Sequence, residues 1–305
     1  MRLDRALLES LARSANGVLV ELRKSAAIDQ LELDMVAVLE RVYQEQFGRP
    51  AEDLLSAALE LMPEVVPGDR SAALVDQLIT LGEGVDLTLD DRRALEDKTE
   101  QGYRLERQGV ARQLAVDVTW GLKDQEAVDW LGKETPFWIG RHYDLKTSEW
   151  IRSAAREVGL EAGLGVDATA DMFQDLLGRH YQRSRAYWEL LATNAITRAR
   201  NFGGVESFVQ GRILEVEVVA VMDGRTSEIC RELNGTVYQV QMAVQQRDQV
   251  LGVDPDGLRQ VAPWPSLSQV QELVDQPDPA AALSRAGIVI PPYHGNCRTF
   301  LAARM

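Results

Sequence analysis

Two short segments near the end of the chain hold the residues best suited to chemistry. The first segment ends at Cys230, and the second contains His294 and Cys297 in the spacing H-x-x-C. Cysteine sulfur, histidine nitrogen and carboxylate oxygen are ligands that zinc accepts in a tetrahedral shell. Cys230, His294 and Cys297 are therefore candidate ligands of a structural metal site, most simply zinc, which Asp223 or a water molecule would complete.

The same residues also fit a packed motif without a metal. In that arrangement His294 and Asn296 hydrogen-bond the turn at Asp223, and both cysteines are small buried apolar groups. We favour this metal-free arrangement, because the segments offer three good ligands where a structural zinc site normally uses four. A disulfide between Cys230 and Cys297 is a third arrangement, which a reducing cytoplasm disfavours.

The sequence contains no recognisable catalytic motif. It has no G-x-S-x-G, no H-E-x-x-H and no glycine-rich phosphate loop beside a basic residue. A cysteine–histidine mechanism would have to use Cys230 or Cys297 with His294, and spacing alone does not establish the hydrogen bond that it requires. We therefore predict that the chain is not an enzyme and has no catalytic residues.

The two segments together form a paired pattern. The first reads D-x-R-T-x-x-x-C-x-x-L-x-G and the second reads P-P-x-H-x-N-C-R. This pair, following a helical stretch that ends at Asn201-Phe202, resembles the C-terminal domain of the phage Mu protein F family of head morphogenesis, or minor head, proteins. The resemblance covers about residues 100–303. Its structural motif corresponds here to Asp223, Arg225, Thr226, Cys230, Leu233, Gly235, Pro292, His294, Asn296, Cys297 and Arg298.

The chain departs from the family pattern at two positions. Many members of the family carry a second cysteine in each half of the motif. Ser227 and Thr299 occupy those positions here. More than fifty residues also separate the two halves, so a complete four-cysteine site is not expected.

The resemblance implies a structural role in a virus particle. A protein of this family is a virion component present in few copies, made in the host cytoplasm and built into the phage head beside the portal. Its expected partners are the portal protein and other head proteins, with only indirect contact to packaged DNA and none with a membrane. Its expected role is capsid assembly and DNA packaging or ejection. The alternatives are a toxin or metal-dependent nuclease built on a Mu F-like domain, or a helical adaptor that shares the module.

The composition agrees with a globular protein that does not bind DNA through its overall charge. Of its 305 residues, 45% are hydrophobic and 26% charged, and the net charge is −14. Residues 1–100 carry 11 basic and 21 acidic side chains. Because an acidic protein gains nothing from counterion release on DNA, sequence-independent binding is disfavoured. An acidic helical surface in residues 1–95 would suit a basic partner surface or simply face solvent.

The apolar pattern predicts a mainly α fold ending in a small α+β domain. Helical periodicity extends from residue 1 to about 203, with helices expected at 52–62 and 71–81 and one starting near Asp90. A further helix is expected from Thr147 to Val158. Another is expected to end at Gly203-Gly204, since glycine commonly terminates helices.

After residue 210 the pattern changes to alternation. Apolar residues alternate with Glu215 and Glu217 in the stretch 214–222, which predicts a half-buried strand. Residues 236–240, 288–290 and 299–302 are expected to supply further short strands. We therefore expect an acidic helical region (1–95), a helical part of the Mu F-like module (96–208) and a small α+β domain with the paired motif (209–305).

Overall fold

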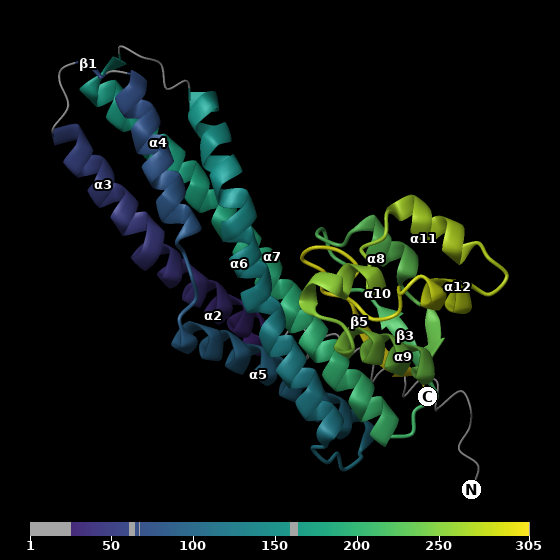
Figure 1. The fold of residues 1–305 in the computed structure, drawn as a ribbon. Helices are drawn as coiled ribbons and strands as arrows, with labels where there is room; N and C mark the ends of the chain where they lie inside the picture. The colour runs from purple at the N-terminus through teal and green to yellow at the C-terminus, as the bar shows by residue number, and fades with distance from the viewer. Residues whose placement is uncertain (1–25, 61–64, 67, 159–163, 305) are drawn as a thin grey trace, which may run out of the picture. The chain divides into compact units, whose positions relative to one another are not determined.

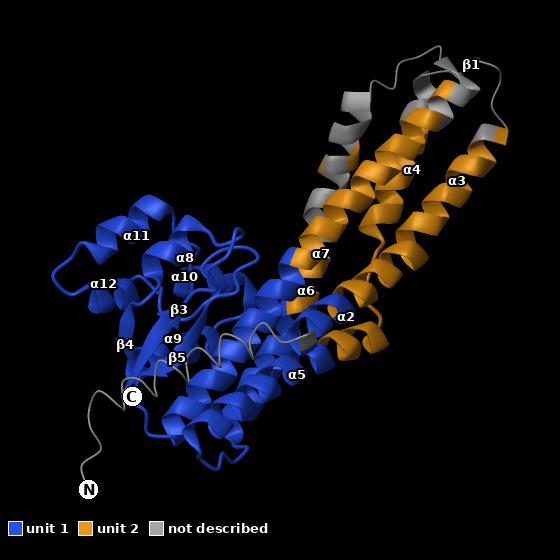
Figure 2. Ribbon diagram, turned by 180° about the vertical axis from the view of Figure 1, so that it is seen from behind, with its two compact units in different colours: residues 1–34, 96–134, 190–305 blue, residues 35–95, 135–189 orange. Residues whose placement is uncertain are grey.

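The computed structural model describes residues 26–60, 65–66, 68–158 and 164–304 (Figure 1). The structure is 72% helical and has a three-stranded antiparallel sheet near the C-terminus of the chain, which confirms the predicted fold class. Contacts between residues divide it into two compact units, each made of discontinuous segments (Figure 2). Of the described residues, unit 1 contains 26–34, 96–134 and 190–304, and unit 2 contains 35–95 and 135–189.

Long helices form most of the chain before the sheet. They are α2 (Ala26–Tyr43), α3 (Arg49–Glu60), α4 (Gly68–Glu83), α5 (Leu89–Leu114), α6 (Leu122–Val158) and α7 (Val166–Gln210). A π-helical turn, η1 (Gln44–Gly48), joins α2 to α3 without a break. Two short strands, β1 (Val65–Val66) and β2 (Leu164–Gly165), pair antiparallel in the part of unit 2 that the structure describes. None of the described helices has the length and apolarity needed to cross a membrane.

Two predicted helix boundaries lie inside longer helices. Helix α6 runs through Thr147, and α7 continues past Gly203-Gly204 to Gln210, so both predicted boundaries are wrong. Gly203 has a packing role: a Cβ atom at this position would lie 2.5 Å from the backbone oxygen of Tyr103 in α5. The glycine therefore allows α5 and α7 to approach closely within unit 1.

The C-terminal part of unit 1 surrounds the sheet with short helices. Its elements are β3 (Glu215–Val219), α8 (Glu228–Leu233), β4 (Val237–Gln239), α9 (Val240–Leu251), η2 (Pro255–Gly257), α10 (Leu258–Val261), α11 (Leu267–Val274), α12 (Pro279–Arg285) and β5 (Phe300–Arg304). Strand β3 lies between β4 and β5 and pairs antiparallel with both. Val216 and Val218 are fully buried while Glu215 and Glu217 are partly exposed, as the alternating pattern predicts.

The prediction of a strand at 288–290 is wrong. The backbone N–H groups of Val289 and Ile290 donate to the side-chain oxygen of Gln246, at 2.9 and 2.7 Å. The amide nitrogen of Gln246 donates in turn to the carbonyl of Gly287. One buried glutamine on α9 thus satisfies backbone groups that a neighbouring strand would otherwise bind.

The last turns of α7 are bonded to the segment that leads into β5. Thr197 donates to the carbonyl of Cys297 at 2.7 Å, and the side chain of Asn201 bonds the carbonyl of Thr299 and the N–H of Leu301. Both α7 side chains in these bonds, Thr197 and Asn201, are buried. These contacts fix the position of the second half of the paired motif within unit 1.

Candidate metal centre

The first half of the motif is a turn followed by the short helix α8. The N–H of Arg225 donates to Asp223 Oδ1 at 2.8 Å, and the hydroxyl of Thr226 donates to the carbonyl of Val221 at 2.6 Å. Ser227 is the N-cap of α8, where its Oγ accepts from the N–H of Cys230 at 3.2 Å. This capping contact places the Cys230 side chain in the first turn of the helix.

The second half is a loop held by its own backbone and by the core. Pro291-Pro292 is a cis peptide, and Asn296 has a left-handed backbone with φ of 57°. The hydroxyl of the buried Tyr293 donates to the carbonyl of Val289 at 2.8 Å, and His294 Nδ1 lies 2.7 Å from the carbonyl of Gly295. Because a carbonyl only accepts, Nδ1 carries the proton and Nε2 is free to accept or to bind a metal.

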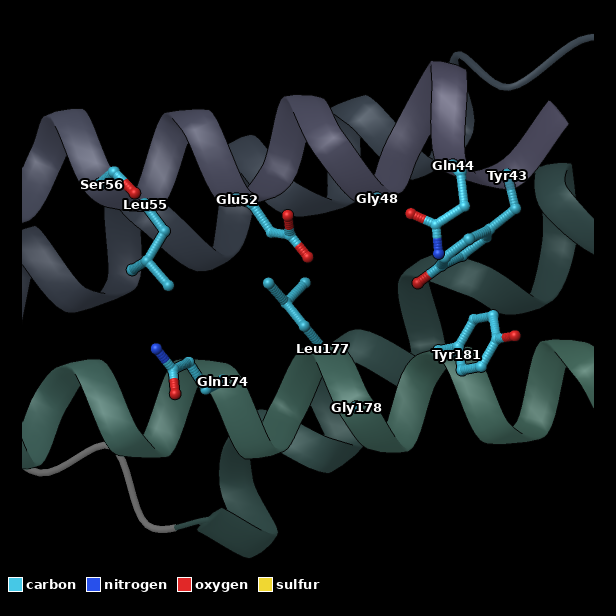
Figure 3. Close-up of a pocket in the computed structure, with 10 residues that line it drawn as sticks. All are labelled: Tyr43, Gln44, Gly48, Glu52, Leu55, Ser56, Gln174, Leu177, Gly178 and Tyr181. Atoms are coloured by element: carbon cyan, nitrogen blue, oxygen red, sulfur yellow. The ribbon is translucent and has the colours of Figure 1, made fainter. Parts of the chain in front are cut away.

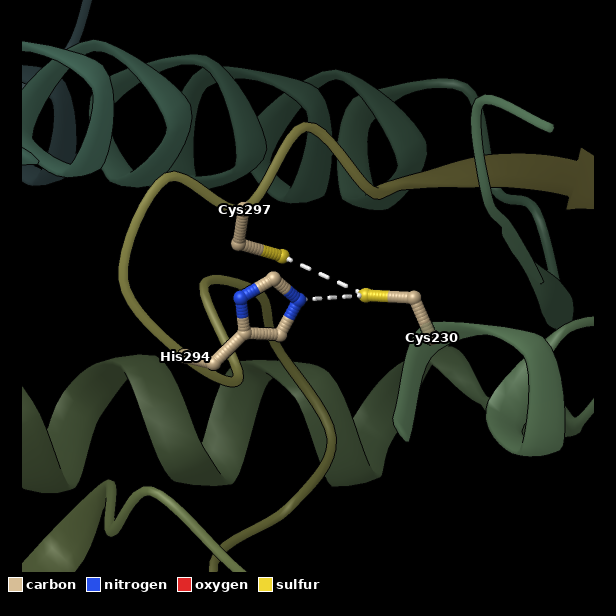
Figure 4. Close-up of side chains that lie close together, drawn as sticks. All are labelled: Cys230, His294 and Cys297. Carbon is tan, nitrogen blue, oxygen red and sulfur yellow. Dashed lines mark hydrogen bonds between the residues drawn. The ribbon is translucent and has the colours of Figure 1, made fainter. Parts of the chain in front are cut away.

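The two halves meet at a cluster of Cys230, His294 and Cys297 (Figure 4). Cys230 Sγ lies 2.9 Å from His294 Nε2 and 3.7 Å from Cys297 Sγ. The three potential ligand atoms all lie within 4.8 Å of one another. Residues 64 and 67 positions apart in sequence are thus brought into direct contact.

Ser227 and Thr299 also belong to this cluster. Ser227 Oγ lies 2.7 Å from His294 Nε2, and Thr299 Oγ1 donates to Cys230 Sγ at 3.0 Å. These are the two positions at which the chain departs from the Mu F-like pattern. Here two hydroxyl groups hydrogen-bond the imidazole and the thiol of the cluster.

Asp223 does not contribute to the cluster, which corrects its prediction as a ligand. Both of its carboxylate oxygens accept from Arg298, at 2.7 and 2.8 Å. This ion pair, together with the backbone N–H of Arg225, lowers the pKa of Asp223 to about 2. The second loop therefore reaches the Asp223 turn through Arg298, whereas His294 bonds Ser227 and Cys230 instead of that turn.

The remaining motif residues shape the surroundings of the cluster. Leu233 is fully buried in the core of unit 1, and Gly235 has a φ of 84° that favours glycine. Pro292 is buried, whereas Arg225 and Asn296 are exposed at the rim of the cluster. These residues support the two loops and offer no further metal ligand.

The two thiols of the cluster differ in pKa. The hydrogen bond to Cys297 and burial together raise the pKa of Cys230 to about 12. Burial opposes ionisation of Cys297 as well, but hydrogen bonds from Cys230 and from the N–H groups of Tyr293 and Thr299 outweigh it and lower its pKa to about 7. Burial likewise disfavours the charged form of His294, yet its contact with Cys230 raises its pKa overall.

The distances fit a metal ion with small adjustments. In a tetrahedral zinc site two sulfurs lie about 3.8 Å apart, and a sulfur and a nitrogen about 3.6 Å apart. The sulfur–sulfur distance of 3.7 Å agrees with this value, while the Cys230–His294 distance of 2.9 Å would have to widen. The group can therefore hold a metal such as zinc through three protein ligands.

The space beside the cluster is very small. A cavity of about 10 Å³ opens next to Cys230 and His294, with Arg225 and Asn296 among its lining residues. That is about the volume that one water molecule requires. Pockets that enclose a small-molecule substrate usually measure about 300–1,000 Å³.

A larger cavity lies in unit 2, and the sequence did not predict it. It has a volume of about 380 Å³ between the segment η1–α3 and α7 (Figure 3). Tyr43 and Tyr181 lie at one end, and the Glu52 carboxylate lies along its side. The π-helical turn η1 lines this cavity, and such turns are frequent at functional sites. Because a π-helical turn has no clear sequence signature, the cavity could not be predicted from the sequence around it.

Comparisons with known proteins returned no match: no family model, no curated protein and no solved structure is similar to this chain.

Proposed function

We propose that this chain is a phage minor head protein, a structural component that joins the head beside the portal. It would be made in the host cytoplasm, take part in capsid assembly and DNA packaging or ejection, and remain in the virion. The proposal starts from the resemblance of residues 100–303 to the Mu protein F family. Its partners would be the portal protein and other head proteins.

The observation that carries the proposal is the contact between the two halves of the paired motif. Arg298 of the second half binds Asp223 of the first, 75 residues earlier, and His294 binds Cys230. Thr299 adds a bond to Cys230. Residues singled out by family resemblance thus interact directly, and each interaction closes a long loop whose entropy the contacts must offset. This is the expected behaviour of a motif that stabilises a domain.

The small cavity at the cluster favours a structural role over catalysis. Cys230 and His294 are close enough for proton transfer, which a nucleophilic mechanism would need. However, a cavity of about 10 Å³ cannot admit a peptide, nucleotide or ester group. A nuclease or toxin built on this site would need an opening that the described residues do not provide.

Two arginines of α7 are not available for contact with DNA. Arg198 and Arg200 are buried, where they pair with Glu134 and Glu106 at 3.0 and 3.1 Å. Their charges are neutralised within unit 1 and cannot contact phosphates. Together with the net charge of −14, this favours a protein partner over nucleic acid.

Zinc is the metal that we propose for the cluster when one is bound. Cys230, His294 and Cys297 would hold it, and a water molecule would supply the fourth ligand. The ion would act only as a cross-link between the two loops. The surrounding residues have the same effect without it, because Ser227 and Thr299 already satisfy the cluster by hydrogen bonds.

The proposal is tested by co-expression with the portal protein encoded nearest to this chain. The full-length chain is expected to co-purify with the portal, and raising the salt concentration should weaken the complex if the acidic N-terminal region contributes. The charge reversals Asp53→Lys and Asp76→Lys, at exposed positions of α3 and α4, should weaken binding. Asp256→Lys, exposed in the C-terminal region, is the matched control and should bind normally. Failure of the full chain to bind portal or procapsid would contradict the proposal.

A further inference from the structure

The two cysteines of the chain are placed to react with each other. Cys230 Sγ and Cys297 Sγ lie 3.7 Å apart, and Figure 4 shows the two side chains pointing toward one another. Both thiols are free and buried. Because the chain contains two cysteines in total, any disulfide within it must join these two.

We propose that Cys230 and Cys297 form a reversible disulfide within the folded chain, so that the cluster is a site of redox modification. A disulfide has a sulfur–sulfur distance of about 2.0 Å, so the sulfurs must move closer by less than 2 Å. Cys297 lies in a loop and Cys230 in the first turn of α8. Rotation of the two side chains can supply most of this movement without shifting the sheet.

The chemistry requires a small disulfide as oxidant, such as oxidised glutathione. One protein thiolate attacks a sulfur of the oxidant, which gives a mixed disulfide and releases one glutathione thiol. The second protein thiol then displaces the remaining glutathione and closes the protein disulfide. Two protein thiols are oxidised, one small disulfide is reduced to two thiols, and the two protons lost by the protein thiols end on the two released glutathione molecules. His294 Nε2, at 2.9 Å, is placed to take the proton of Cys230.

The conditions under which this disulfide would form in nature rest on the proposed function. A head protein is made in a reducing cytoplasm, where the thiols stay free to pack or to bind a metal. After the particle leaves the cell it meets oxidising conditions, and the disulfide would then join α8 covalently to the loop before β5. A metal and the disulfide exclude each other, because both use the same two sulfurs.

The test is a redox equilibrium on the full-length chain after removal of metal by a chelator. The chain is equilibrated with mixtures of reduced and oxidised glutathione, both in native buffer and in urea, and free thiols are then alkylated and counted by intact mass. Pre-positioned thiols have a higher effective concentration than thiols 67 positions apart in an unfolded chain. The native chain should therefore keep its disulfide under more reducing conditions than the urea-unfolded chain. The ratio [GSH]²/[GSSG] at which half of the disulfide is reduced should be at least about tenfold higher for the native chain.

Equal or lower stability of the disulfide in native buffer would overturn the proposal, as would mixed disulfides or linked dimers as the main products. Loss of the folded circular dichroism spectrum on oxidation would also overturn it. Cys230→Ser and Cys297→Ser are the controls and should yield only mixed disulfides. This equilibrium does not depend on portal binding. A failed portal experiment would therefore contradict the role in the phage head, whereas the redox equilibrium alone decides whether the disulfide forms.

Discussion

Asp223 and Arg298 form the contact that links the outer edges of the two motif loops. Both hydrogen bonds, of 2.7 and 2.8 Å, come from one guanidinium nitrogen of Arg298, which bridges the two carboxylate oxygens of Asp223. Both side chains are partly exposed, so solvent screens the pair and its contribution to stability is small. Its main effect is to fix the distance between the turn at Asp223 and the loop at Arg298.

The first prediction concerns acid stability. The pKa of Asp223 is about 2 in the folded chain, below its ordinary value of 3.8. A carboxylate with a lowered pKa stabilises the fold above the unfolded pKa, and this stabilisation is lost as the pH falls through the folded pKa. The melting temperature of the natural chain should therefore fall more steeply between pH 4 and 2 than that of Arg298→Ala. Arg298→Lys, which keeps the charge, should lie between them, and parallel acid profiles would contradict this account.

The second prediction concerns the buried cluster. His294→Ala removes the bonds to Ser227 and Cys230, and Cys230→Ser disturbs the bonds to His294 and Thr299. Each change should lower the free energy of unfolding by about 1–3 kcal/mol, the usual cost of leaving a buried polar group unpaired. Glu232→Ala, on the exposed side of α8, is the control and should be neutral.

Elemental analysis separates the two states of this cluster. If the purified chain holds zinc at a one-to-one ratio, losing one ligand should abolish metal uptake and destabilise the fold more severely. That result would overturn the preference for a metal-free motif. Two variants that melt like the parent chain would contradict both arrangements.

The sequence predicted the members of the cluster better than their contacts. The types and spacing of Cys230, His294 and Cys297 were sufficient to single them out. The partner of Asp223 was not predictable, because Arg298 and a metal are both suitable partners for a carboxylate. Only the three-dimensional placement of the second loop decides between them.

At the scale of elements, α7 connects the helical part of unit 1 to the motif. Its residues Thr197 and Asn201 bond the segment before β5, while Gly203 faces α5. Consecutive turns of one helix thus position both the motif loop and a neighbouring helix. A change in the packing of α5 on α7 should therefore destabilise unit 1 as a whole.

The third prediction tests this packing. Gly203→Ala would place a methyl group 2.5 Å from a backbone oxygen of α5, and backbone cannot move aside easily. The variant should lose about 1–3 kcal/mol of stability, the usual cost of overpacking. Gly204→Ala is the control, since its Cβ would lie 3.6 Å from a side-chain atom of Glu106. The control should be neutral or stabilised by up to about 1 kcal/mol through helix propensity. Chemical denaturation measures both, and an unchanged Gly203→Ala would contradict the packing role.

The difference between local and long-range signals explains which elements the sequence predicted. The alternation around Val216 and Val218 is a local pattern, and the strand there was found. The glycines at 203 and 204 have the local signature of a helix end, but the role of Gly203 comes from α5, about a hundred residues earlier. The same holds at 288–290, where Gln246 replaces a partner strand. The cavity in unit 2 also depends on residues from distant segments.

At the scale of the whole molecule, the segments expected from the sequence differ from the two compact units of the structure. The expected segments 1–95, 96–208 and 209–305 follow the sequence, whereas α6 and α7 each contribute residues to both units. A truncation at either expected boundary would remove parts of a core. Point substitutions at exposed positions are therefore the appropriate way to map partner surfaces on this protein.

The distribution of charge also belongs to this scale. The excess of acidic residues lies mainly in residues 1–100, and the buried arginines of α7 are neutralised internally. A surface of this kind favours association with basic protein surfaces and disfavours phosphate backbones. Both tendencies agree with a component that contacts other head proteins and reaches DNA only indirectly.

The most direct test of the proposed function is quantitative mass spectrometry of phage heads purified from cells that encode this chain. The account predicts that the chain sediments with assembled heads, in few copies relative to the major capsid protein and at a constant ratio to the portal protein. Heads assembled with the Cys230→Ser/His294→Ala double variant should contain less of the chain. Fully assembled, DNA-filled heads that lack the natural chain altogether would contradict the account.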